Sequence, residues 1–247
     1  LKFKTATLKK EHFKIEIQYL GPIMAIGMGS FFNQLAMMLV QIVLNNSLKH
    51  YGALSQYGKD IPIACAGIVM KVSQVFFSIV IGIAQGTQPI ESFNYGAKNY
   101  KRVRDAYKMA CLAGGTVSLL SFIMFQIFPR QILAAFGEGT PEYFEFGEKY
   151  FRIFLFFTCL NFIQPITSTF FTSIGKAIKG VFLSLTRQIL FLLPLLLILP
   201  KFFGIDGVVY AGPISDIVAC TIAVLMVWFE FRTMKKMERE EGLCLKE

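Results

Sequence analysis

The sequence is poor in the residues from which catalytic and metal sites are built. It has two histidines, His12 and His50, and neither has a His or Cys partner at metal-ligand spacing. No Walker loop, dinucleotide-binding fingerprint or nucleophile with a nearby base occurs. The five cysteines lie far apart along the chain: Cys65, Cys111, Cys159, Cys220 and Cys244. Their spacing predicts neither a disulfide framework nor a zinc site, so we expect a protein that is not an enzyme and holds no metal or organic cofactor.

Charge is also scarce, whereas apolar residues are abundant. Only 17% of the residues are charged, 54% are hydrophobic, and there are 26 phenylalanines. The mean hydropathy of +0.54 is far above that of a soluble domain. The net charge of +9 does not indicate nucleic-acid binding, because the basic residues cluster beside apolar segments. Composition therefore predicts an all-α integral membrane protein.

Six apolar segments are long enough to cross a bilayer, which takes about 20 residues. They run approximately over residues 19–48, 61–84, 109–128, 153–175, 180–200 and 207–229. An even number of spans places both termini on the same side. We therefore expect a bundle of six transmembrane helices over residues 19–232, preceded by a basic arm (1–18) and followed by a basic tail (233–247).

The basic residues indicate which side is cytoplasmic. Of the 25 Lys and Arg residues, 17 fall in the N-terminal arm, the 94–108 loop, the 176–179 turn and the C-terminal segment from Arg232 onward. These four regions share one face under the six-span arrangement, so both termini are predicted to be cytoplasmic. The opposite loop contains residues 129–136, which we expect to form a short interfacial helix. Trp228 ends the last span and fits the aromatic belt at the membrane surface.

Three charged residues lie inside predicted spans. Lys71 is about 15 Å into its span, and a charge at that depth requires a water-filled cavity or a partner. Asp216 is the only carboxylate comparably embedded, so a pair between Lys71 and Asp216 is one testable arrangement. For Arg187 two interpretations stay open: a cap on cytoplasmic carbonyls, or a residue of a cavity.

Uncharged polar side chains also recur within three spans. Gln34 and Gln41 lie at helical spacing, as do Asn161 and Gln164, so each pair shares a helix face. Such groups form interhelical hydrogen bonds or line a polar cavity, and their number favours the cavity. The predicted cavity residues are Asn33, Gln34, Gln41, Lys71, Gln74, Asn161, Gln164 and Arg187.

Glycines and prolines mark expected bends and close contacts. Gly82 and Gly86 are four residues apart, a spacing that lets helices approach closely, and Gly96 suits the following turn. Pro165 and Pro194 each remove a backbone donor within a span. A static bend and a functional hinge both remain open for these two prolines.

Ordered landmarks along the whole chain resemble those of one family. They are Gly82-Ile-Ala-Gln-Gly86, Gln88-Pro89, Asn94-Tyr95-Gly96-Ala97, Arg102-Val-Arg104, Pro129, Phe136-Gly137, Gly175-Lys176, Arg187-Gln188, Leu193-Pro194, Gly204-Ile-Asp-Gly-Val208, Gly212-Pro213 and Ser215-Asp216. In this order they resemble the C-terminal half of multidrug and toxic compound extrusion (MATE) transporters, with a DinF-like appearance. No single landmark is specific, so the resemblance depends on their order.

The resemblance implies a fold and a function. Members of this family have twelve helices in two six-helix lobes, so this chain looks like the second lobe, with residues 1–18 as an interlobe linker. The family exports small cationic amphiphilic compounds in exchange for protons or sodium, by alternating access of a cavity between the lobes. The implied partners are the lipid bilayer of the plasma membrane and an N-terminal lobe of the same polypeptide.

One departure from the family concerns ion coupling. Some branches carry cation-binding carboxylates in the first and fourth helices of this lobe, where the resemblance places Gln34 and Asn161. Amides do not titrate, so coupling would depend on the other lobe or on Asp216. Two alternative functions stay open: a flippase for a lipid-linked anionic precursor, suggested by Lys71 and Arg187, and an assembly partner that does not transport.

Overall fold

The computed structural model describes residues 17–137 and 139–244, and within these ranges every regular element is a helix. The elements are α1 (Ile17–Ala53), α2 (Asp60–Gly96), α3 (Tyr100–Ile127), α4 (Pro129–Phe136), α5 (Pro141–Phe154), η2 (Thr158–Leu160), α6 (Ile163–Ser173), α7 (Ala177–Leu185), η3 (Thr186–Leu192), α8 (Leu193–Phe203) and α9 (Ile205–Cys244). Most of the predicted N-terminal arm and the last three residues lie outside the described ranges.

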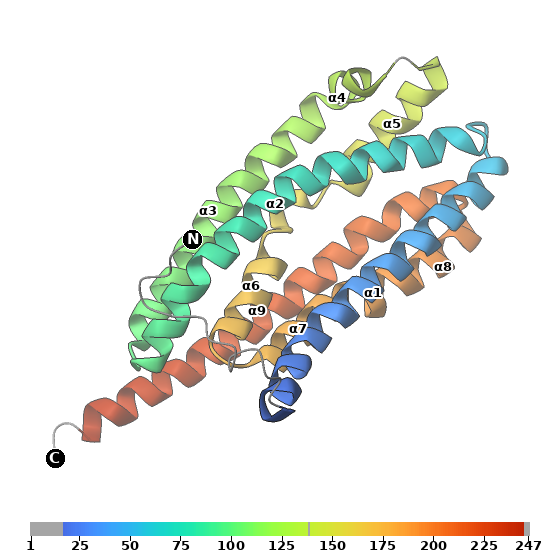
Figure 1. Ribbon diagram of the computed structural model, residues 1–247. Helices are drawn as coiled ribbons and strands as arrows, with labels where there is room; N and C mark the ends of the chain where they lie inside the picture. The colour runs from blue at the N-terminus through green and yellow to red at the C-terminus, as the bar shows by residue number, and fades with distance from the viewer. Residues whose placement is uncertain (1–16, 138, 245–247) are drawn as a thin grey trace, which may run out of the picture.

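The helices form an elongated bundle whose segments have membrane-spanning length. Five segments in the described part are long and apolar enough to cross a bilayer: 60–96, 100–127, 141–173, 177–203 and 205–240. The 37-residue helix α1 is a further long element and contacts α2, α7, α8 and α9. Figure 1 shows the α2–α3 turn and the C-terminal part of α9 at one end of the bundle, and the α1–α2 turn and α4 at the other.

The helices α1, α2, α3 and α9 are regular and extend beyond their predicted spans. Helix α2 continues through Pro89 to Gly96, twelve residues past the predicted span at 61–84. Helix α9 continues to Cys244, so most of the predicted tail is helical as well. The predicted short helix over 129–136 is confirmed as α4.

The fourth and fifth segments keep membrane-spanning length, but their helices are interrupted near Pro165 and Pro194, where the sequence predicted a bend or a hinge. Helix α5 ends at Phe154, a single 3-10 turn (η2) follows, and α6 begins at Ile163 with Pro165 in its first turn. A proline is tolerated in a first turn because the missing N–H has no helical partner there. The fifth segment changes from α7 into a π-helix (η3) and returns to an α-helix one residue before Pro194. Both prolines therefore stand where a helix restarts.

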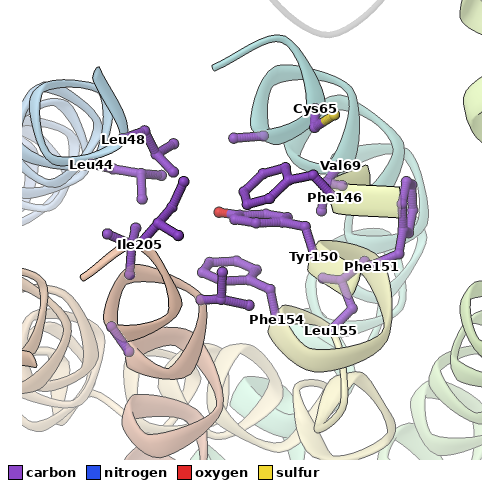
Figure 2. Packing of buried hydrophobic residues seen from close by; sticks show 14 of the residues in the cluster. Leu44, Leu48, Cys65, Val69, Phe146, Tyr150, Phe151, Phe154, Leu155 and Ile205 are labelled. Carbon is purple, nitrogen blue, oxygen red and sulfur yellow. The ribbon is translucent and has the colours of Figure 1, made fainter. Parts of the chain in front are cut away.

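Aromatic packing holds the end of the bundle where α1 meets α2. Figure 2 shows Phe146, Tyr150 and Phe154 of α5 in a column that faces Leu44 and Leu48 of α1. The rings of Tyr150 and Phe154 are stacked with centroids 4.9 Å apart. We call the buried residues around this column, which come mainly from α1, α2, α5, α8 and α9 and include Phe125 of α3 and Leu133 of α4, the first apolar cluster.

A second apolar cluster lies nearer the α2–α3 turn. It contains buried residues of α2, α3, α6 and α9, including Val80, Val103, Phe170 and Val227. Along α9 the first cluster ends at Ala211 and the second includes Val227. The stretch between these positions holds Ser215 and Asp216, which are buried polar residues.

The close helix contact expected at Gly82 and Gly86 is not seen within the described residues. A Cβ atom added at either position, or at Gly96, would have nothing within 4 Å. At Gly180 of α7, in contrast, a Cβ would lie 2.6 Å from the carbonyl oxygen of Ser168 in α6. Gly180 therefore permits the tight crossing of α6 and α7.

Candidate functional site

The candidate site is formed by the side chains of Asp216, Arg187 and Asn161, which we call the Asp216 cluster. The Asp216 carboxylate, 3% exposed, accepts a hydrogen bond from Arg187 Nε at 2.7 Å through Oδ1. Its other oxygen, Oδ2, accepts a hydrogen bond from Asn161 Nδ2 at 2.9 Å. A buried carboxylate requires such partners, because an unpaired charge in a low-dielectric interior is strongly unfavourable.

The cluster joins the two interrupted segments to α9. Asn161 lies in the break between η2 and α6, and Arg187 lies in the π-helix η3. Asp216 is eleven residues after the start of α9, about 16 Å along the helix axis and near the middle of a bilayer about 30 Å thick. Charged groups at such interruptions, near the membrane midplane, are typical of transporter binding sites.

The arrangement leaves part of Arg187 available to other groups. Its Nε bonds Asp216, and its side chain is 21% exposed, so it is not sealed inside the bundle. A guanidinium has five N–H donors, of which one is used here. The cluster therefore has a neutralised carboxylate on its buried side and a partly accessible guanidinium on the other.

The expected pair between Lys71 and Asp216 is wrong. Lys71 is exposed on the regular helix α2, and no ion pair of Lys71 occurs within the described ranges. Helix α2 is a continuous helix, so the direction of each side chain follows from its position in the helical turn. Arg187, and not Lys71, is the ion-pair partner of Asp216. This favours the interpretation of Arg187 as a cavity residue over that of a cap on cytoplasmic carbonyls.

Of the other predicted cavity residues, Gln164 lies in α6 near the Asp216 cluster, and the rest lie on α1 and α2. Gln164 is half-buried near the cluster and donates to the Leu183 carbonyl at 3.3 Å, where α7 approaches the π-helix. On α1, Asn33 is half-buried, Gln34 is exposed, and Gln41 donates to Asn45 of the same helix at 3.2 Å. Gln74 is exposed on α2. Within residues 17–137 and 139–244, no hydrogen bond joins these α1 and α2 side chains to Asp216.

Hydroxyl groups near the cluster hold α6 against its neighbours. Ser168 donates to the Gly180 carbonyl at 2.8 Å and also contacts Ser184 of α7 at 2.8 Å. Thr167 is fully buried and shares a hydrogen bond of 2.8 Å with the hydroxyl of Tyr107 in α3. These bonds fix α6, and with it the start of the helix that follows Asn161.

A second polar group, which sequence reasoning missed, lies at the end of the bundle near the α6–α7 turn. Glu230 of α9 is 3% exposed and accepts hydrogen bonds from Lys176 and, at 3.3 Å, from Lys179. Glu91 is 1% exposed and accepts a bond of 2.7 Å from Ser173, while its Oε1 has no partner among the described residues. In the sequence Lys176 and Lys179 stood in a turn that we interpreted only as a topology marker. The available signal was the two acidic residues, Glu91 and Glu230, that lie between an apolar run and a basic segment.

The comparisons with known proteins agree on one family. The family profile described as MatE matches residues 30–198. The multidrug export protein MepA of Staphylococcus aureus (strain MSSA476) is 23% identical over 211 residues, which make up 85% of this chain and 45% of that protein. MepA of Staphylococcus haemolyticus (strain JCSC1435) is 21% identical and matches 92% of this chain and 48% of its own length.

Solved structures share the fold. One, described as the outward-facing conformation of a multidrug resistance MATE family transporter of the MOP superfamily, has a TM-score of 0.80 and 20% identity and covers 93% of this chain and 50% of that one. Another, described as the inward-facing conformation of a multidrug resistance MATE family transporter of the MOP superfamily, has a TM-score of 0.79 and 20% identity and covers 92% of this chain and 51% of that one. The chain spans about half the length of the relatives it matches.

Proposed function

Because the chain belongs to the MatE family, we propose that it forms half of a secondary active multidrug exporter, with the Asp216 cluster as the polar centre of its lobe. The observation that carries this proposal is the buried carboxylate of Asp216, held by side chains from two interrupted helices. Interrupted helices near the midplane supply donors and carbonyls to ions and substrates in secondary transporters. The proposed transport is an exchange of organic cations for protons or sodium by alternating access.

The half-length match supports a two-lobed protein. Both MepA proteins are matched over slightly less than half of their length, and the solved structures over about half. We propose that a second six-helix lobe, joined at the N-terminal side, completes the cavity. The many exposed apolar side chains of α1, such as Phe31, Leu35 and Met38, are available for contact with lipid or with that lobe.

The lobe is expected to move largely as one body. Its fold resembles the outward-facing and inward-facing structures almost equally, with TM-scores of 0.80 and 0.79. If the lobe itself changed shape greatly during transport, one of the two similarities would be clearly lower. This near equality supports alternating access by rocking of two lobes.

The proposed role of Asp216 is to exchange cationic partners. In the described state Arg187 neutralises Asp216, so no external cation is needed there. An organic cation, or a coupling proton or sodium ion, would compete with the Arg187 guanidinium for the same carboxylate. Asn161 would keep its hydrogen bond to Oδ2 through the exchange and hold the carboxylate in place.

The test is a transport measurement on reconstituted protein. We would compare vesicles that contain the 247-residue chain with vesicles that contain the product of the complete reading frame around it. Efflux of a fluorescent organic cation is measured under an imposed proton or sodium gradient. We expect gradient-dependent efflux by the longer protein, at least about tenfold slower in its Asp216→Asn variant, because a neutral amide cannot attract a cation. Efflux that ignores both gradients would contradict the antiporter proposal.

The structure gives little support to the alternative function as a flippase. It depended on two cations inside the bundle, and one of them, Arg187, is compensated by Asp216. Lys71 is the remaining candidate and is exposed on α2. A Lys71→Met variant with an unchanged substrate range would argue that Lys71 is structural and would remove the last support for a flippase. Mass measurement in detergent would test the other alternative, a non-transporting assembly partner.

A further inference from the structure

An open groove of about 340 Å³ lies between α3, the start of α6 and α9, and it is outside the Asp216 cluster. We call it the α3/α9 groove. Its wall includes Tyr107 and Cys111 of α3, Phe162 beside α6, and Val224, Trp228 and Phe231 of α9. These residues belong to segments with membrane-spanning composition, so the groove opens toward the bilayer.

The wall of the groove suits a hydrocarbon chain. Val224 is 50% exposed and Trp228 is 46% exposed, so the apolar wall is accessible from outside. The one hydroxyl in the wall, that of Tyr107, is already bonded to Thr167 at 2.8 Å. A polar solute would therefore find almost no hydrogen-bond partner in the groove, whereas an acyl chain has no hydrogen bonds to lose by entering it.

Basic residues stand at one end of the groove. The guanidinium of Arg232 lies over the Trp228 ring, 3.5 Å from the ring centroid, and Arg232 has no ion pair within the described residues. Lys108 of α3, one turn before Cys111, has a side chain that is 68% exposed and only a weak contact of 3.9 Å with Asp105. The neighbouring Arg104, in contrast, is paired with Glu238 at 2.7 Å. The free positive charge at this end therefore has no protein counter-ion of comparable strength.

The order of these residues along α9 matches the shape of a phospholipid. Arg232, Trp228 and Val224 are spaced by four residues and share one helix face. Over these eight residues the helix rises about 12 Å, from the basic end toward the middle of the apolar segment. A head group at Arg232 would place its acyl chain along Trp228 and Val224.

From this geometry we propose that the α3/α9 groove binds an anionic phospholipid of the adjoining leaflet, with its phosphate between Arg232 and Lys108 and one acyl chain in the groove. A zwitterionic lipid fills the same space, but it gains less because its head group has no net negative charge. The preference for an anionic head group is the part of the proposal that distinguishes this site from ordinary lipid contact.

Trp228 reports on this site directly, because it is the only tryptophan of the chain. The 247-residue chain is reconstituted in phosphatidylcholine vesicles with increasing fractions of lipid brominated on its acyl chains. Bromine quenches tryptophan fluorescence on contact. One series uses brominated phosphatidylglycerol and the other uses brominated phosphatidylcholine, and the ratio of quenching gives the relative binding constant at Trp228.

The expected result is a relative constant of at least about five in favour of the anionic lipid, since one basic residue near a membrane surface has about this effect. Arg232→Gln should lower the constant about fivefold, because only Lys108 then remains at the head group. The matched control is Arg102→Gln, which removes an exposed arginine of α3 that does not line the groove. Equal quenching of the unaltered chain by both lipids would overturn the proposal, and so would quenching by neither, since protein would then cover Trp228.

Discussion

The regular helix α2 and the interrupted segment formed by α7, η3 and α8 place their intramembrane cations, Lys71 and Arg187, in different environments. Lys71, on the regular helix α2, is exposed at its depth in the bundle. Arg187, at comparable depth in its own segment, lies in a π-helix and is paired with buried Asp216. Two cations at similar depth in the sequence therefore differ in their surroundings: Lys71 is exposed on an α-helix, and Arg187, in a π-helix, is paired with a buried carboxylate.

The interrupted segments also contain backbone carbonyls that accept hydrogen bonds from polar side chains. Pro200 removes the N–H that would bond the Leu196 carbonyl, and Ser47 of α1 donates to that carbonyl at 3.4 Å. Gln164 donates to the Leu183 carbonyl where the helix pattern changes. In a membrane, backbone groups that leave the helical pattern require partners from side chains or water. Polar residues therefore gather along the interrupted segments for structural as well as functional reasons.

The largest expected effect comes from breaking the Asp216 cluster. Arg187→Met should lower the free energy of unfolding by about 3 kcal/mol, because it leaves buried Asp216 without a counter-ion. The measurement is reversible unfolding in mixed detergent micelles. Arg152→Met, at an exposed position of α5, is the matched control and should change stability little.

The double variant Arg187→Met/Asp216→Leu sharpens this test. Removing both charges takes away the buried unpaired carboxylate, so most of the lost stability should return. If the double variant were less stable than Arg187→Met alone, charge pairing would not be the main contribution of the cluster.

A smaller change in stability is expected from substitution of glycines, and it should differ between the interrupted and the regular segments. Gly180→Val should cost about 1–3 kcal/mol, because its Cβ would meet the Ser168 carbonyl oxygen at 2.6 Å. Gly82→Ala, on regular α2 with nothing within 4 Å, should be neutral or gain up to about 1 kcal/mol. Thermal unfolding of both variants in the same detergent measures the difference, and equal destabilisation would show that Gly82 has a contact beyond this chain.

A third change tests the carbonyl freed by Pro200. Ser47→Ala should cost about 0.6 kcal/mol, the average value of an interhelical hydrogen bond in a membrane protein. In a Pro200→Ala background the cost should be smaller, since the new N–H bonds the Leu196 carbonyl. A double-mutant cycle of the unfolding free energies measures this coupling, and identical costs in both backgrounds would argue against it.

The smallest effect is expected at an exposed ion pair. Lys149 Nζ and Asp206 Oδ1 are 2.6 Å apart, yet their side chains are 36% and 37% exposed. Lys149→Met should therefore cost less than about 1 kcal/mol, and the cost should fall as salt is added. A cost as large as that of Arg187→Met would remove the contrast between buried and exposed pairs.

Most of the fold could be predicted from the sequence. Each span needs a long apolar run; the segments at 61–84 and 207–229 lie within helices α2 and α9, and the segment at 109–128 ends one residue after α3. The interruptions could not be located in this way, since the run at 155–162 is mostly apolar while its backbone leaves the α-helix. Pro165 and Pro194 indicated irregular positions, but not whether a 3-10 turn, a π-helix or a simple bend would form.

The candidate site could be predicted in its members but not in its pairing. Asn161, Arg187 and Asp216 were each selected because a polar group in an apolar span needs a partner. The chosen partner for Asp216 was wrong, because depth along a span says nothing about the direction of a side chain around the helix. Gln34, Asn33, Gln41 and Gln74 were selected by the same reasoning, and the structure places them on α1 and α2, where none of them bonds Asp216 within the described ranges.

The sequence alone determined that this is an all-helical membrane protein, which helices carry the basic ends, and which family its ordered landmarks resemble. These properties depend on composition and order along the chain. Tertiary structure alone decided that Asp216 is neutralised by Arg187 and not by Lys71. The residues that meet at Asp216 are 29 and 55 positions away in the chain, and only the broken α5–α6 segment and the π-helix turn them toward the same carboxylate.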